Sequence, residues 1–209
     1  MKNRAYKKSI KREILSSKAR FTSIMAIIFL GVAFYSGIKS CGPDLKNSIN
    51  EFFAKQNLMD SKIVSSIGLN ENDLKLLENN DKILDYYATH SVDVNLTNTN
   101  NVVKFMEYDT SSSDKMNKAV VTEGRLPRSS GEIALDVNAL KVDKNLKIGD
   151  NYVIESDEDS ESYFKKKTFK IVGFVQSPIY IDNTSRGSTT VGKGSIDYFA
   201  LINNCYWKY

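Results

Sequence analysis

The chain has 209 residues, with 29 lysines and arginines, 25 aspartates and glutamates, and a formal net charge of +4. Its content of 41% hydrophobic and 26% charged residues excludes wholesale disorder, a collagen-like chain and a membrane protein with many spans. Two cysteines are too few for a disulfide-stapled scaffold or a four-thiolate zinc site. The isoelectric point of about 8.8 suits nucleic-acid binding only until the charges are located along the chain.

The positive charge is concentrated at one end. Residues 1–39 carry nine basic side chains and a single acid, Glu13, which gives this segment a charge of +8. The remaining residues hold 20 basic and 24 acidic side chains, a net charge of −4. Most of the chain would therefore repel a phosphate backbone, and the sequence predicts no nucleic-acid partner.

An uncharged apolar segment, Phe21–Ile38, follows the basic end. As a helix it would be about 27 Å long, close to the bilayer hydrocarbon thickness of about 30 Å. Arg20 and Lys39 flank it and can reach the two interfaces. A buried helix of a soluble domain is the alternative, but such a helix normally carries a polar stripe. We expect a transmembrane helix over residues 21–38.

A cleaved signal peptide is a second alternative for the same segment. The apolar run is longer than the roughly 7–15 residues of a signal peptide, and no small-residue cleavage site follows it. Lys39, two positions before Cys41, argues against lipoprotein processing. More lysines and arginines precede the helix than directly follow it, so the positive-inside rule predicts a cytoplasmic N-terminus and residues 39–209 outside the cell.

The first 20 residues have an amphipathic pattern. Tyr6, Ile10 and Ile14 recur at intervals of four, and basic residues fill many of the other positions. A helix with this pattern is suited to lie in the lipid headgroup layer, where anionic leaflets attract lysine and arginine. The alternative is a frayed basic tail that serves only to set the topology. Residues 1–20 are thus expected to be a basic amphipathic cytoplasmic segment.

Beyond the membrane, residues 39–209 predict one mixed α+β domain. Pro43-Asp44 resembles a helix start, and apolar residues recur at helical spacing to about Asn57, so we expect the spanning helix to continue outward as a stalk. Asn70–Asp73 predicts the start of a short helix that ends near Leu77. A helical turn is expected at 137–140 and a Gly/Ser/Thr-rich loop at 183–195. Strands are predicted over Ser61–Ile67, Tyr86–Leu96, Asn101–Asp109, Lys118–Glu123, Glu132–Asp136, Asn151–Glu155, Phe169–Val175, Ser177–Ile181 and Ile196–Ile202.

Two segments approach known ligand-binding motifs without completing them. Gly187–Gly194 nearly forms a phosphate-binding loop, but Gly194 stands where that loop needs a serine or threonine to ligate magnesium. Asp157–Glu161 begins like a calcium loop, yet Ser162 and Thr168 stand where glycine and a bidentate glutamate are required. A flexible loop and a solvated hairpin loop are the better interpretations.

No catalytic constellation is recognisable. His90 is the single histidine, and it is best interpreted as a residue at a strand edge with no marked nucleophile beside it. Whether Cys41 and Cys205 pair stays open. Ala33 and Gly37 form a small-xxx-small pair that would allow another helix to approach. We predict no catalytic, cofactor-binding or metal-ligating residues, no cofactor and no enzymatic activity.

Several segments, taken in order, resemble one protein family. The chain is similar to the N-terminal part of an FtsX-like ABC transporter permease whose first extracellular region is a MacB-like periplasmic core domain. The segments that carry the resemblance run from the basic end and the apolar run (18–39) through Pro43-Asp44-Leu45, Asn57–Asp60, Ile63–Leu69, Glu123-Gly124-Arg125-Leu126-Pro127, Gly131–Leu135, Lys147–Asp150, Ile171-Val172-Gly173, Ser177–Ile181 and Arg186-Gly187-Ser188.

The resemblance implies a membrane component without catalytic residues. An ATPase on a separate cytoplasmic subunit would supply the energy, and the outer domain would transmit or receive movement during extrusion, peptide-antibiotic resistance or signalling. The expected partners are the lipid bilayer, the ABC ATPase subunit, and the remaining permease helices or a second permease chain. Gly124, Pro127 and Gly149-Asp150 suit turns that maintain the fold.

The sequence departs from this family in having a single long apolar run, whereas such permeases have at least four spans. We therefore interpret the chain as a truncated permease or a split subunit, with an outer domain that is not complete. The alternative is a single-pass, membrane-anchored extracellular module that binds a ligand or the cell wall. An extracellular hydrolase, resting on His90 alone, is the third possibility.

Overall fold

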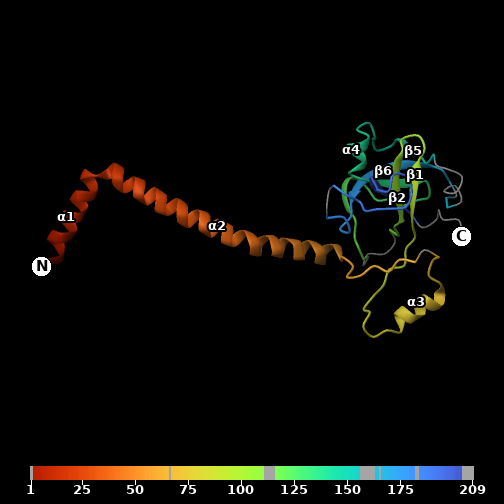
Figure 1. The fold of residues 1–209 in the computed structure, drawn as a ribbon, viewed down its shortest axis with the longest axis horizontal. Coiled ribbons are helices and arrows are strands. Elements are labelled where there is room, and N and C mark those ends of the chain that lie inside the picture. Colours follow the sequence, from red (N-terminus) through yellow and green to blue (C-terminus); the bar gives the residue numbers. More distant parts are fainter. Residues whose placement is uncertain are drawn as a thin grey trace. The chain divides into compact units, whose positions relative to one another are not determined.

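The computed structural model describes residues 2–65, 67–110, 116–155, 163–164, 166–181 and 184–203 (Figure 1). The predicted acidic loop at 157–161 and Cys205 lie outside these residues. The chain divides into two compact units, residues 1–52 and residues 53–209, and each is described by itself. The architecture is mixed α+β, with one long apolar helix near the N-terminus and a domain built on a curled sheet (Figure 1).

The first unit is helical. Helix α1 (Lys2–Ser16) is followed after a single residue, Ser17, by helix α2 (Lys18–Gln56). Pro43-Asp44 resembles a helix start, but no new helix begins there, because α2 runs through Pro43 without interruption as the expected stalk. Proline has no N–H to donate, so one backbone bond of α2 is missing at that turn. The predicted continuation of the helix to about Asn57 is confirmed, since α2 ends at Gln56.

The second unit is built on a seven-stranded mixed sheet. Its path runs β1-β2-β7-β4-β6-β3, and β5 also pairs with β6. The β2–β7 and β4–β6 pairs are parallel and the other pairs are antiparallel. The strands are β1 (Ser91–Leu96), β2 (Asn101–Glu107), β3 (Val120–Gly124), β4 (Glu132–Asp136), β5 (Asn151–Val153), β6 (Thr168–Gln176) and β7 (Tyr198–Ile202).

The core of this unit lies on both faces of the sheet. Successive residues of a strand point to opposite faces, and on β4 both sets are buried. Ile133 and Leu135 belong to the larger apolar cluster, whereas Ala134 belongs to a smaller cluster that contains Phe199. All five residues of β7 are buried. The central strands are therefore covered on both sides, as expected for near-continuous apolar sequences such as YFALI.

Several predicted elements are confirmed. Helix α3 (Glu71–Glu78) begins at Asn70, whose side chain accepts hydrogen bonds from the N–H groups of Asn72 and Asp73. Asp73 accepts in turn from the Asn70 N–H, which completes a capping box. Strand β4 has the predicted bounds, and β5 pairs antiparallel with β6. The predicted helical turn is found slightly later, as helix α4 (Ala139–Val142).

Two predicted strands are wrong, and a third is five residues too long at its start. Residues 61–65 form no strand and are largely exposed, because no sheet edge pairs with them. Residues 177–180 form a turn closed by the Tyr180 N–H and the Ser177 carbonyl, 3.0 Å apart. Strand β1 starts at Ser91, so the first five residues of the predicted strand at 86–96 lie outside the sheet.

Candidate functional site

Helix α2 is the most distinctive candidate for a functional element. None of its residues is buried, and its best 18-residue window has a mean hydropathy of 2.0. Its 39 residues correspond to about 58 Å, nearly twice the hydrocarbon thickness of a bilayer. Side chains such as Ile27, Leu30 and Phe34 are more than half exposed. Among the described residues it is the one helix long and apolar enough to span a membrane.

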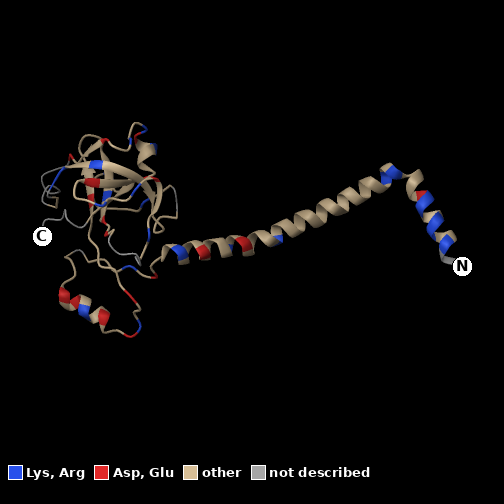
Figure 2. Cartoon of the chain, turned by 180° about the vertical axis from the view of Figure 1, so that it is seen from behind, with Lys and Arg blue, Asp and Glu red and all other residues tan. Residues whose placement is uncertain are grey.

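Charge separates the two helices of the first unit. Lysine and arginine dominate α1, whereas the apolar part of α2 carries neither sign (Figure 2). The structure thus has the basic helix, the helix with the uncharged segment 21–38 and the α+β domain in the order that the sequence predicts. The predicted membrane boundary at residue 38 lies inside α2, which continues past it to Gln56.

Backbone hydrogen bonds tie the end of α2 to the segment that enters β3. The Lys118 N–H donates to the Gln56 carbonyl and the Asn117 N–H donates to the Asn57 carbonyl, both at 2.8 Å. The Asn117 side chain accepts from the Met59 N–H at 3.0 Å. Asn57 and Asn117 have φ angles of 49° and 56°, which asparagine tolerates better than most residues. This junction joins the last turn of α2 to the sheet.

Arg125 and Glu132 form a two-bond ion pair at the corner after β3. Arg125 donates through Nη1 to Oε2 at 2.7 Å and through Nη2 to Oε1 at 2.5 Å. The N–H groups of Arg128 and Ser129 also donate to Oε2. The hydrogen bonds from Arg125, with those from the two backbone N–H groups, hold the pKa of Glu132 well below its usual range. The carboxylate therefore organises the turn between β3 and β4.

Four segments that carry the family resemblance meet on strand β6. Gly124 lies opposite Gly173 in the β3–β6 register. The Arg125 N–H donates to the Val172 carbonyl at 3.0 Å, and the Gly149 N–H donates to the Ile171 carbonyl at 2.8 Å. These contacts join the segments 123–127, 147–150 and 171–173, and Arg125 links them to 131–135 through Glu132. The four segments maintain one corner of the fold.

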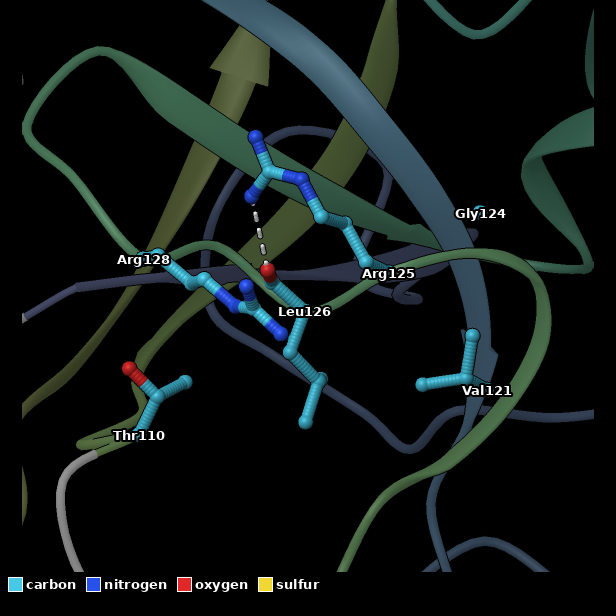
Figure 3. Close-up of a pocket in the computed structure, with 6 residues that line it drawn as sticks. All are labelled: Thr110, Val121, Gly124, Arg125, Leu126 and Arg128. Atoms are coloured by element: carbon cyan, nitrogen blue, oxygen red, sulfur yellow. Dashed lines mark hydrogen bonds between the residues drawn. The ribbon is translucent and has the colours of Figure 1, made fainter.

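A surface pocket of about 440 Å³ opens beside this corner (Figure 3). Its charge is that of two arginines, but the Arg125 guanidinium is neutralised by Glu132 and also donates to the Leu126 carbonyl. Within the described residues the lining offers no acid, histidine or cysteine for acid–base or nucleophilic chemistry. The pocket is lined by Thr110, Val121, Gly124, Arg125, Leu126 and Arg128.

A buried ion pair links Arg186 to the end of β4. Arg186 donates to Asp136 through Nε at 2.5 Å and Nη2 at 3.1 Å, and both side chains are almost fully buried. The guanidinium lies 5.3 Å from the Tyr180 ring centre and 5.9 Å from that of Phe199. Burial raises the pKa of Tyr180 to about 12. Sequence reasoning missed Asp136, although an acid ending the apolar run EIALD was the available signal.

His90 takes part in the closure of a hairpin. It lies directly before β1, and its Nδ1 is 2.7 Å from Oε2 of Glu107, a buried carboxylate at the end of β2. The Glu107 N–H donates to the His90 carbonyl at 2.9 Å, and Thr89 Oγ1 donates to the Glu107 carbonyl. These bonds close the open end of the β1–β2 pair, which is a structural role for the only histidine of the sequence.

The loop at 187–194 folds back on itself. Ser188 forms a bridge with Ser195, and the Ile196 N–H donates to the Gly187 carbonyl at 3.0 Å. Lys193 pairs with Asp197 at 2.7 Å, so the lysine of the incomplete phosphate-binding motif is engaged within the loop. The described residues of this stretch therefore form a loop, as the sequence predicts.

Other ligand chemistry is not assembled in the described part of the chain. Among those residues, no group of three or more histidines, cysteines, aspartates or glutamates could hold a metal ion. Cys41 is a free, exposed thiol on α2, and the question of its pairing with Cys205 lies outside the described residues. Comparisons of the sequence with protein-family models, curated proteins and solved structures find no match.

Proposed function

We propose that this chain is a membrane component of an FtsX-like ABC transporter. Residues 21–38 of α2 form its transmembrane part, the N-terminus is cytoplasmic, and residues 39–209 lie outside the cell as a MacB-like domain. A separate cytoplasmic ATPase supplies the energy for extrusion or signalling. The bilayer, this ATPase and further permease helices, from the remainder of a permease or a second chain, are its partners.

The observation that carries this proposal is the meeting of the resembling segments on β6. Here 123–127, 131–135, 147–150 and 171–173 contact one another through backbone bonds and one ion pair. Their joint role in one structural corner is what a shared fold requires of them, and it supports the resemblance.

The mechanical layout also supports the proposal. The span is one end of the continuous helix α2, and the other end is bonded to the segment before β3 at Asn117 and Lys118. A helix that crosses the bilayer and leads directly into a sheet domain provides a covalent route for displacement between the two sides. The positive charge before the span favours the orientation with this sheet outside.

The second unit has exposed apolar side chains that further permease parts could cover. Ile63, Val64 and Ile67 precede α3, and Leu76 and Leu84 lie on and after it. Their exposed fractions are 64% for Ile63 and 97% for Ile67, well above what a core residue shows.

The test is purification of the tagged full chain from its native membranes in mild detergent, followed by identification of what is retained with it. We expect an ABC ATPase and a protein with several spans. Replacing Ala33 and Gly37 by leucine should reduce their recovery, because large side chains prevent close helix approach. Gly31→Leu, on the opposite side of the helix, is the control and should not reduce it.

A single-pass binding module is the second candidate. It is favoured by the fact that residues 53–209 form a compact unit with a core of their own. Recovery of a membrane-integrated chain with neither an ATPase nor a polytopic partner would decide for this candidate. A hydrolase centred on His90 has weaker support, since His90 is bound to Glu107 at the end of a hairpin.

A further inference from the structure

We propose that α1 binds anionic lipid headgroups through a cationic arc on one flank of the helix. This proposal rests on the proposed span, because it requires α1 to start from the membrane surface. The expected amphipathic segment lies in the headgroup layer. The proposal adds that one flank of the helix prefers lipids whose headgroups carry a net negative charge.

The arc follows from helical geometry. Successive residues of an α-helix are rotated by about 100°, so the positions of α1 can be placed around its axis. From Arg4 onward, the cations of α1 fall within an arc of about 140°, and all are exposed; Lys2, at the start of the helix, and Glu13 fall outside that arc. The residues of the cationic arc are Arg4, Lys7, Lys8, Lys11 and Arg12.

The apolar stripe of α1 lies beside this arc. Tyr6, Ile10 and Ile14 fall within about 80° of one another, and the arc begins at Lys7, about 20° beyond Ile14. Tyr6 and Ile10 have exposed fractions of 69% and 41%, so the described chain leaves them accessible. With the stripe in the acyl boundary, the neighbouring cations lie at the level of the lipid phosphates.

The connection to α2 keeps α1 at the bilayer. Ser17 is the one residue between the two helices, and the Phe21 N–H donates back to the Ser17 carbonyl at 3.1 Å. Since the apolar segment starts at Phe21, all of α1 lies within about 30 Å of chain from the membrane surface. A negatively charged lipid leaflet is the occupant that matches both the apolar stripe and the cationic arc.

The test uses the full chain with Cys41→Ser and Cys205→Ser, labelled at Ile10→Cys with a polarity-sensitive fluorophore and placed in lipid nanodiscs. Phosphatidylcholine discs are compared with discs containing increasing phosphatidylglycerol. We expect a blue shift that grows with phosphatidylglycerol and falls with added salt. Lys8→Gln with Lys11→Gln should raise the phosphatidylglycerol fraction needed for half the shift several-fold. Lys46→Gln with Lys55→Gln, which removes equal charge from α2, should not.

Three results would overturn the proposal. An equal shift in both lipids would mean that the apolar stripe alone binds. No shift in either lipid would indicate a frayed tail or a protein occupant such as the ATPase. An equal rise, in both charge variants, of the phosphatidylglycerol fraction needed for half the shift would show a general charge effect. A chain that alkaline washing removes from the discs would instead contradict the span, and the proposed function with it.

Discussion

Arg186 and Asp136 are charged groups placed where water cannot reach them. Removing one partner of such a buried pair leaves an uncompensated charge, which costs about 3–5 kcal/mol. We therefore expect Arg186→Met to lower the free energy of unfolding of the full chain in detergent by that amount, measured by urea unfolding followed by circular dichroism. Arg128→Met is the control, because Arg128 is exposed and forms no ion pair within the described residues. Equal urea midpoints for the two variants would contradict the buried ion pair between Arg186 and Asp136.

Glu132 gives the second prediction at this scale, a dependence on pH. The folded-state pKa of Glu132 is depressed, chiefly by the hydrogen bonds from Arg125. The contribution of this carboxylate to the free energy of unfolding is therefore complete above the ordinary carboxyl pKa of about 4.3. That contribution is lost as the pH falls through the lower folded-state pKa.

Glu132→Gln should therefore be less stable at neutral pH and should lose less stability on acidification than the unmodified chain. Urea unfolding at several pH values measures both effects. Glu123→Gln, which removes an exposed carboxylate of β3, should leave the acid dependence nearly unchanged. If Glu132→Gln lost as much stability on acidification as the unmodified chain, the Glu132 carboxylate would not be the cause of the acid dependence.

At the scale of elements, β6 determines where the neighbouring segments can lie. A Cβ at Gly173 would lie 2.4 Å from the Arg125 carbonyl oxygen and 2.7 Å from the Arg125 nitrogen. These are backbone atoms and cannot move aside as a side chain can. We expect Gly173→Ala to destabilise the chain by about 1–3 kcal/mol in urea unfolding. Gly37→Ala, with no atom within 4 Å, should have no such effect, and equal stability of both variants would refute the close packing.

Local signals in the sequence predicted the elements that depend on local physics. The capping box of α3 lies in consecutive residues, and the bounds of β4 follow from one apolar run ended by Asp136. Local signals failed at Ile63 and Val64, which were predicted to lie in a strand and form none. An apolar stretch becomes a strand only where a sheet edge pairs with it. At Pro43, the resemblance to a helix start did not produce a new helix, and α2 continues outward as the sequence predicts.

The order of the strands could not be predicted from the sequence. Strand β7 lies between β2 and β4, although the Val103–Tyr198 pair joins residues far apart in the chain. Periodicity assigns a residue to a face and carries no information on which strand lies beside it. For the same reason the contacts of Arg125 with Glu132 and of Arg186 with Asp136 became visible only in the folded chain.

At the scale of the whole molecule, the charge distribution and the helix lengths have a common explanation. A basic helix, a helix with an exposed uncharged segment at residues 21–38, and a domain with its own core are what a membrane-anchored protein needs in that order. The net charge of +4 is then an orientation signal combined with a mildly acidic outer domain. The central claim is that α2 crosses the membrane with the sheet domain outside.

Cysteine labelling on intact cells tests this claim most directly. In the background lacking Cys41 and Cys205, Ser9→Cys on α1 and Ser130→Cys in the loop before β4 each provide one exposed thiol. We predict that a membrane-impermeant maleimide labels Ser130→Cys on intact cells and labels Ser9→Cys only after lysis. Labelling of both, or of neither, before lysis would contradict the proposed topology.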